Sequence, residues 1–260
     1  LNQFKSLIEF EFDKKLIKFN RIVCTSTPRR IVLLIEGLVD HAEDKIIIRK
    51  GPKAISAFLN GVPTNAALGF ANSLGINIDD LEIKNTEKGE FVFGKKVEKG
   101  ESTKESLSLI IPKVIKNLQG PRFMKWGYGN FKFSRPIRWI VSIYNDEILD
   151  FVLDECDPKI LIGNKSKSHR LINQEIEIHN PGNYFELMFE NSVLVNRTER
   201  KEKIVGLINQ SSELIDVNPD LSEELLNELT DLVESPDLII GKFSEEFLDI
   251  PVEVLSTVMK

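Results

Sequence analysis

Apolar and polar residues follow helical and strand periods in different parts of the chain, without a regular order. In residues 1–19, apolar side chains recur every three or four positions with lysines between them, which predicts an amphipathic helix. Stretches of β-branched residues predict three strands, and the turn at residues 25–30 joins the first two. These strands are Ile22–Cys24, Ile31–Gly37 and Ile46–Ile48.

A Gly-Pro pair then interrupts the strand pattern and opens a predicted helical insert over about residues 51–80. One short helix is predicted at Lys53–Leu59. A second is predicted over Asn65–Leu74, with Thr64 as its N-cap and Gly75 at its end. The residues of this second helix are mostly apolar, which favours packing over base recognition, so DNA is not expected as a partner.

The remaining pattern predicts both strands and helices. The predicted strands are Glu90–Lys96, Ile137–Tyr144, Glu147–Leu153 and Leu238–Ile240, and the predicted helices are 102–118, Asn196–Leu232 with a break near Asn218, and Val252–Met259. The fold class is therefore α+β, with irregular mixed sheets and packed helices. A composition shift near residues 155–175 predicts two modules, residues 1–155 and residues 156–260, the second helix-rich and acidic toward its end.

Composition places the chain among soluble globular proteins, since 42% of its 260 residues are hydrophobic and 28% are charged. No apolar run is long enough to cross a bilayer, and no segment resembles a secretory signal. The two cysteines are interpreted as free thiols, which favours a cytoplasmic location. Because the sequence begins at Leu1 within an amphipathic pattern, it is interpreted as a fragment.

Charge is unevenly distributed along a chain whose net charge is −6. Residues 106–145 contain seven Lys or Arg and no acid, whereas residues 211–260 contain thirteen Asp or Glu and two Lys. Such a protein can offer a polyanion one surface and repel it from another. Two ordinary solvated faces are the alternative that charge alone leaves open.

Motifs for self-contained catalysis are missing from the sequence. There is no Gly-rich phosphate loop and no nucleophile elbow, and the three histidines do not have metal-ligand spacing. Neighbouring carboxylates on a helix point apart, which makes them poor acid–base partners. We therefore predict no catalytic residue, no metal ligand and no cofactor bound by this chain.

The strongest signal lies in residues 122–139, where five basic residues alternate with aromatic ones. Cations neutralise phosphates and flat rings stack on unpaired bases, so this pattern is typical of RNA contact. A loop with its rings in the core and its cations at the rim is the alternative. Two smaller basic clusters occupy residues 27–30 and 165–170. The candidate RNA-binding residues are Arg29, Arg30, Lys125, Arg135, Arg138, Lys167, His169 and Arg170.

A series of short motifs in this chain resembles one known family. Met124-Lys125-Trp126-Gly127 followed by Phe133-Ser134-Arg135-Pro136 is similar to a signature of the beta subunit of bacterial two-subunit glycyl-tRNA synthetase. Further stretches match that family in the same order, namely Thr27–Arg30, Lys50–Pro52, Gly69–Ala71, Lys88–Glu90, Gly100–Thr103, His169-Arg170, Leu232–Pro236 and Gly241–Phe243. The sequence departs from the family pattern at Ser168 and Ser235.

The resemblance implies a partner-dependent enzyme. In this family an alpha subunit binds ATP with Mg²⁺ and forms the glycyl adenylate within an α2β2 assembly, and the beta subunit contributes tRNA binding. The implied partners are an alpha subunit and tRNA(Gly), with this chain alone inactive. The front part of the family also looks similar to the editing domain of the phenylalanyl synthetase beta chain. An editing hydrolase and an RNA-binding module independent of any ligase are therefore the alternatives.

Overall fold

The computed structural model describes residues 1–219 and 221–258, which form two compact units. Unit 1 consists of Leu1–Phe10, Asn20–Glu36 and Leu107–Lys260, and unit 2 consists of Glu11–Phe19 and Gly37–Ser106. The boundary expected between residues 155 and 156 falls inside unit 1, and the division into units is made elsewhere in the chain.

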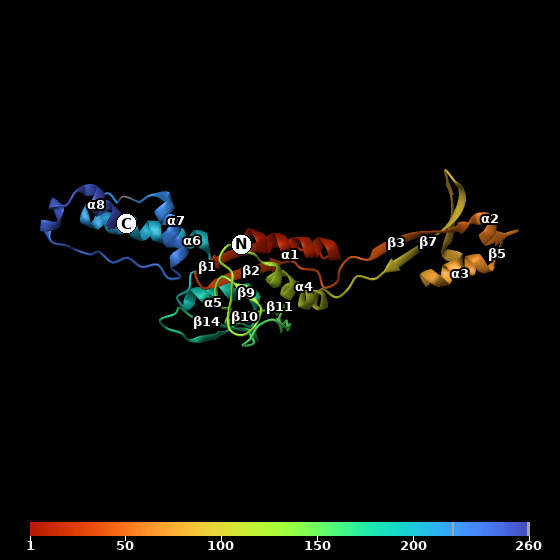
Figure 1. Ribbon diagram of the computed structural model, residues 1–260, viewed down its shortest axis with the longest axis horizontal. Helices are drawn as coiled ribbons and strands as arrows, with labels where there is room; N and C mark the ends of the chain where they lie inside the picture. The colour runs from red at the N-terminus through yellow and green to blue at the C-terminus, as the bar shows by residue number, and fades with distance from the viewer. Residues whose placement is uncertain (220, 259–260) are drawn as a thin grey trace. The chain divides into compact units, whose positions relative to one another are not determined.

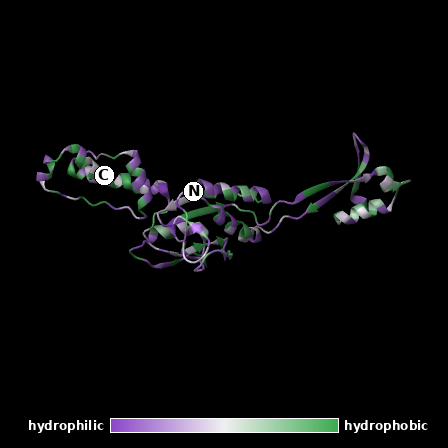
Figure 2. Ribbon diagram, in the orientation of Figure 1, coloured by the Kyte–Doolittle hydropathy of each residue, from purple (hydrophilic) through white to green (hydrophobic). Residues whose placement is uncertain are grey.

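The α-helices of the described residues are short to medium in length, and Figure 1 labels them in chain order. They are α1 (Asn2–Lys15), α2 (Ala54–Ala57), α3 (Asn65–Leu74), α4 (Thr103–Asn117), α5 (Tyr184–Glu190), α6 (Arg197–Ile215), α7 (Glu223–Leu232) and α8 (Val252–Val258). Single 3-10 turns occur at Ile78–Asp80, Pro181–Asn183 and Glu245–Asp249. In Figure 2, hydrophobic and hydrophilic residues alternate along α1, as an amphipathic helix requires.

Unit 1 is built on small strand pairs rather than one continuous sheet. Its antiparallel pairs are β1 (Arg21–Thr27) with β2 (Arg30–Glu36), β8 (Met124–Lys125) with β9 (Lys132–Phe133), β11 (Ile143–Tyr144) with β12 (Glu147–Ile148), and β14 (Lys165–Lys167) with β15 (Glu175–Glu177). One pair is parallel, β10 (Trp139–Val141) with β13 (Leu161–Gly163). Together with the helices, these pairs confirm the predicted α+β class.

A hydrophobic cluster fills part of unit 1 beside α5. Met188 and Val193 are fully buried in it, and Val195 is nearly so. Val32 of β2 packs against the same cluster. The first strand pair is thereby joined to a helix more than 150 positions further along the chain, a connection that the hydrophobic pattern alone does not specify.

Unit 2 has a three-stranded antiparallel sheet in the order β3 (Lys45–Lys53), β7 (Gly89–Glu98), β6 (Leu81–Thr86). The helices α2 and α3 lie between β3 and β6 in the chain and pack on one face of this sheet, where Ala57, Ala67 and Val92 are fully buried. A short hairpin of β4 (Phe58–Leu59) and β5 (Val62–Pro63) connects the two helices.

Several predicted boundaries are confirmed. Helix α3 has the predicted range, Thr64 accepts a hydrogen bond from the backbone N–H of Ala66, and Gly75 adopts the left-handed conformation with φ of 68°. The helical stretch after Asn196 is interrupted before Ser222, whose hydroxyl caps α7 by accepting from the N–H of Leu225. These features depend on local backbone chemistry, which the sequence carries directly.

Other predictions were wrong. The helix expected at Lys53–Leu59 is only the single turn α2, because Phe58 is extended and the following Asn-Gly turn forms a hairpin. No strand occurs at Leu238–Ile240, where Ile239 is 92% exposed and the described residues offer it no partner strand. In the last predicted helix, Met259 lies outside the described residues.

Three further elements are shorter than predicted, and one of them is the strand expected at Glu147–Leu153, of which only β12 (Glu147–Ile148) forms. Helix α1 ends at Lys15 rather than near residue 19, because Leu16 has a left-handed φ of 59°. The strand predicted over Ile137–Tyr144 is divided between β10 and β11. The backbone N–H of Ser142 donates to the carbonyl of Gly163 and its own carbonyl accepts from Leu149, so the chain changes partner there.

Candidate nucleic-acid interface

The first basic cluster forms the turn between β1 and β2, and its arginines are held within the protein. Arg30 is 8% exposed, and its guanidinium donates to the carboxylate of Glu234 and to the backbone carbonyl of Lys167. The hydroxyl of Thr27 donates to the same Glu234 oxygen at 2.6 Å. Arg30 therefore joins three segments of unit 1 and is not presented to solvent.

Arg29 lies beside this buried pair and is half-buried. Its Nη1 atom is 3.7 Å from Oε2 of Glu234. The guanidinium carbons of Arg29 and Arg30 each lie 6.0 Å from the centroid of the Trp139 ring, within reach of a cation–π contact. Desolvation by the same surroundings raises the pKa of Tyr184 to about 12, so its hydroxyl stays protonated at neutral pH.

A second arginine cluster, at the start of α6, was not found from the sequence. Arg200 is fully buried and donates to four backbone carbonyls, those of Ser26, Leu194, Val195 and Thr230, at 2.7–3.2 Å. Burial lowers the pKa of its guanidinium below the usual value. One feature of the sequence could have identified Arg200 as a buried residue. It lies four residues before the buried Ile204, which places it on the inner face of the helix.

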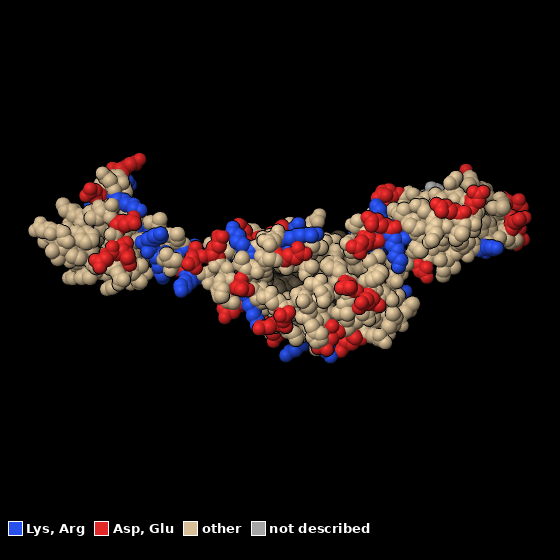
Figure 3. All heavy atoms as spheres, turned by 180° about the vertical axis from the view of Figure 1, so that it is seen from behind, with Lys and Arg blue, Asp and Glu red and all other residues tan. Residues whose placement is uncertain are grey.

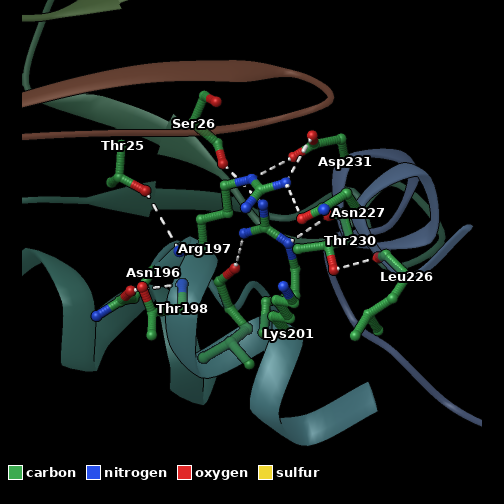
Figure 4. Close-up of polar contacts among 12 residues, drawn as sticks. Thr25, Ser26, Asn196, Arg197, Thr198, Lys201, Leu226, Asn227, Thr230 and Asp231 are labelled. Carbon is green, nitrogen blue, oxygen red and sulfur yellow. Dashed lines mark hydrogen bonds and ion pairs between the residues drawn. The ribbon is translucent and has the colours of Figure 1, made fainter. Parts of the chain in front are cut away.

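Arg197, one turn earlier, faces outward and binds α7. Its Nε and Nη2 atoms donate to the two carboxylate oxygens of Asp231 at 2.7 and 2.9 Å, and Nη2 also donates to Asn227 (Figure 4). This bidentate geometry fixes α7 against the start of α6. Hydrogen bonding from Arg197 lowers the pKa of Asp231. The basic residues at this end of unit 1 thus serve its internal structure.

The segment with the strongest sequence signal forms the hairpin of β8 and β9, called here the basic hairpin (residues 122–138). Its tip is fixed by its backbone to residues 155–157 of the same unit. The N–H of Tyr128 donates to the carbonyl of Asp157 at 2.9 Å, and the N–H of Asn130 donates to that of Glu155 at 2.9 Å. The position of the hairpin is therefore defined by main-chain hydrogen bonds.

Two glycines make this close approach possible. A Cβ atom on Gly127 would lie 2.0 Å from the carbonyl oxygen of Asp157, and one on Gly129 would lie 2.1 Å from that of Glu155. Gly127 also has a positive φ of 74°. The group that approaches these glycines is the backbone of another segment of the same unit.

The aromatic residues of the basic hairpin divide between packing and exposure. Phe123 and Phe131 pack on Phe133, with ring centroids 5.0 and 6.0 Å apart. The ring nitrogen of Trp126 donates to the carbonyl of Phe133, and its side chain is 37% exposed. Tyr128 at the tip is 94% exposed. Some rings of this hairpin therefore form a small core, and the ring of Tyr128 is exposed at its tip.

The cations of the basic hairpin are mostly exposed. Lys125 donates to the side chain of Asn130 at 2.7 Å. The side chains of Arg135 and Arg138 are exposed, and within the described residues neither side chain forms an ion pair or a hydrogen bond. The same holds for Arg122 and Lys132, so four cations of this segment face solvent without an acidic partner in the described part of the chain.

The third cluster, at residues 165–170, is placed against acids. Strand β14 pairs with β15, which brings Glu175 opposite Lys167 and within 2.7 Å of the ammonium group of Lys165. Lys167 and His169 are half-buried, whereas Arg170 is exposed. The acids of β15 partly neutralise this cluster, which lies next to them only because of the strand pairing.

Candidate residues are thus separated into two groups. Lys125, Arg135, Arg138 and Arg170 lie at the surface, whereas Arg29, Arg30, Lys167 and His169 are buried or half-buried. In Figure 3, Asp and Glu side chains gather over the α6–α8 end of unit 1, in agreement with the acidic composition of that region.

Three other features of the chain bear on function. In residues 1–219 and 221–258, no three His, Cys, Asp or Glu side chains are arranged to hold a metal ion. None of the helices in that part of the chain is long and apolar enough to cross a membrane. Cys24 and Cys156 are free thiols, and partial burial raises the pKa of each.

The fold and surface together define a mixed α+β protein with a fixed, basic hairpin. A family model described as glycyl-tRNA synthetase beta subunit matches residues 1–260. The chain belongs to this family. Similar proteins include the glycine–tRNA ligase beta subunits of Trichodesmium erythraeum, 41% identical over 261 residues, and of Clostridioides difficile, 36% identical over 262 residues. Each alignment covers 100% of this chain but only 36% and 38% of those proteins, so the chain spans little more than a third of their length.

Proposed function

We propose that this chain is the tRNA-handling part of a glycine–tRNA ligase beta subunit. In this proposal a separate alpha subunit uses ATP and Mg²⁺ to activate glycine and transfers it to tRNA(Gly). This chain contributes to holding the tRNA and binds no cofactor of its own. Family membership supports the ligase role, because the relatives are named glycine–tRNA ligase beta subunits. The proposal places the protein in the cytoplasm, where its two free thiols stay reduced.

The observation that carries the tRNA assignment is the group of exposed, unpaired cations on the basic hairpin. A Lys or Arg that already has an acidic partner gains little from a phosphate, because it must first give up that partner. Arg135 and Arg138 have no such partner in the described part of the chain. They are available to replace the counterions of a phosphate backbone, which is the main favourable term in RNA binding.

The anchoring of the basic hairpin also favours RNA binding. Its tip is hydrogen-bonded to residues 155–157, so the backbone has little freedom left to lose on binding. Tyr128 at that tip is 94% exposed, and such a ring can stack on an unpaired base. The hairpin thus offers fixed cations and a free ring on one short segment.

Binding of tRNA(Gly) to the full-length beta subunit with its alpha subunit tests this proposal. Arg135→Ala and Arg138→Ala should each weaken binding and lower the slope of log K against log salt by about one unit for each phosphate that is no longer neutralised. Lys203→Ala is the matched control, because Lys203 is an exposed cation on the acidic α6–α7 side of the same unit. Thermal unfolding should be unchanged in all three.

The assignment fails if both hairpin variants bind tRNA(Gly) with the wild-type affinity and salt slope. A uniform decrease in affinity in the hairpin variants and in Lys203→Ala would instead indicate a general charge effect rather than a defined surface.

A further inference from the structure

The sheet of unit 2 has one covered face and one open face. On the covered face, Val92 is fully buried, and a Cβ added to Gly94 would lie 2.3 Å from the side chain of Leu74 in α3. The strand registers place Ile46, Ile48 and Val97 on the opposite face, where they are 55%, 59% and 52% exposed. The three strands therefore present a side that α2 and α3 do not cover.

Two aromatic rings occupy the central strand of this open face. Phe91 and Phe93 are two residues apart on β7 and so project to the same side. The ammonium group of Lys50 lies 3.5 Å from the centroid of the Phe91 ring, and that of Lys84 lies 5.9 Å from the centroid of Phe93. Both rings are thus approached by cations from the neighbouring strands.

The open face carries a net positive charge. In the strand registers, its charged positions are Lys50, Lys53, Lys84, Lys95 and Glu82, which is four cations against one acid. Glu82 is 2.8 Å from Lys84, and the hydrogen bond from Lys84 and the nearby charge of Lys95 lower the pKa of Glu82.

A hollow of about 280 Å³ lies on this face beside Phe93. Ile46 and Ile48 line it together with Glu82, Lys84 and Lys95, and Gly94 contributes backbone without a side chain. Lys84 is paired with Glu82, whereas Lys95 has no ion pair within the described residues, so the apolar wall beside Lys95 suits a planar ring that is attached to a phosphate.

We propose that the open face of the β3–β7–β6 sheet binds unpaired nucleotides of RNA, with a base stacked on Phe93 and a phosphate held by Lys95. This inference rests on the proposed function, because it assigns a second RNA contact to the same chain. Aromatic rings on a central strand bordered by cations form a platform that accepts any base, since every base has a stacking face. The four-to-one excess of lysine favours a polyanion over an apolar protein surface.

Binding of a short oligouridylate to the full-length beta subunit with its alpha subunit tests the inference. Phe93→Leu keeps an apolar side chain but removes the ring, and should weaken oligouridylate binding about tenfold. Phe93→Trp should retain or strengthen it. Lys95→Ala should weaken binding and reduce the salt slope.

Lys96→Ala is the matched control. Lys96 is the next residue on β7 after Lys95, but its register partner Ile47 places it on the covered side, and it is 3.5 Å from Glu98. This variant should bind oligouridylate as the wild type does. Far-ultraviolet circular dichroism and thermal unfolding establish that each variant is folded.

The inference is overturned if folded Phe93→Leu and Lys95→Ala bind oligouridylate with wild-type affinity. It is also overturned if these variants no longer associate with the alpha subunit while they keep RNA binding, because the face would then be a protein-docking surface. Failure here is distinguishable from failure of the proposed function, which depends on tRNA(Gly) binding by the Arg135 and Arg138 variants.

Discussion

Arg30 and Glu234 form an ion pair although 204 positions separate them in the chain, and each side chain is 4% exposed. Arg30 comes from the β1–β2 turn, and Glu234 lies just after the end of α7. The backbone carbonyl of Glu234 also accepts from the N–H of Leu194 at 2.8 Å. This pair attaches the acidic end of unit 1 to its first strand pair. Arg30 therefore has a structural role, although the sequence alone placed it among the candidate RNA contacts.

Removal of one member of this pair should destabilise unit 1. Glu234→Gln is expected to cost about 3–5 kcal/mol, because it leaves a buried guanidinium without its counter-charge. Thermal unfolding of the full-length subunit measures this, with Glu245→Gln as an exposed control. Replacing Arg30 by Met and Glu234 by Leu together should be less harmful than Glu234→Leu alone. An unchanged unfolding midpoint in Glu234→Gln would contradict the structural role.

The two arginines of α6 should respond differently to substitution. Arg200→Met is expected to lower the unfolding midpoint strongly, since four buried carbonyls would be left without their donors. Arg197→Ala should have a small effect of about 0–1 kcal/mol, because its partner Asp231 is largely exposed. Arg200→Lys should not restore stability, because an ammonium group lacks the planar set of donors. Equal effects at the two positions would argue against this assignment.

The glycines of the basic hairpin should be sensitive to a single added carbon. Gly129→Ala is expected to displace the hairpin tip, because the new Cβ would lie 2.1 Å from the carbonyl oxygen of Glu155. Both the unfolding midpoint and the affinity for tRNA(Gly) should fall. Gly163→Ala is the control, since no atom lies within 4 Å of its added Cβ. If Gly129→Ala bound tRNA normally, the anchored position of the tip would be irrelevant to binding.

The Arg197–Asp231 pair should give a small dependence of stability on pH. Its hydrogen bonds lower the pKa of Asp231 below the ordinary value of 3.8. The stabilisation is therefore fully present above that ordinary value and disappears as the pH falls through the lower, folded-state pKa. The unfolding midpoint of Asp231→Asn should lie slightly below that of the wild type at pH 7, and the difference should vanish in strong acid. A difference that persisted there would assign the effect to packing.

Glycine activation should depend on the partner subunit. We expect this chain of 260 residues, free of alpha subunit, to catalyse no glycine-dependent pyrophosphate exchange, because it contains no nucleotide-binding motif. The exchange should appear when the alpha subunit is added. Exchange by this chain alone would overturn the division of labour proposed above. Release of amino acid from mischarged tRNA by the same preparation would instead support the editing alternative.

Local chemistry was enough to predict many elements of this fold. Thr64 and Gly75 mark the two ends of α3, and the β1–β2 hairpin and the break before α7 follow from turn and cap residues. Each of these depends on interactions among residues close together in the chain. The α+β class followed from the same periodicities.

Only the tertiary structure decided which basic residues are free at the surface. In the fold, Arg30 is a buried partner of Glu234, and strand β15 places acids beside Lys167. Arg135 and Arg138, by contrast, are exposed. It also decided that Phe91 and Phe93 share an open face with lysines from two other strands. The sequence alone determined where cations and rings occur. Strand pairing and burial determined which of them meet an opposite charge, because those contacts join residues far apart in the chain.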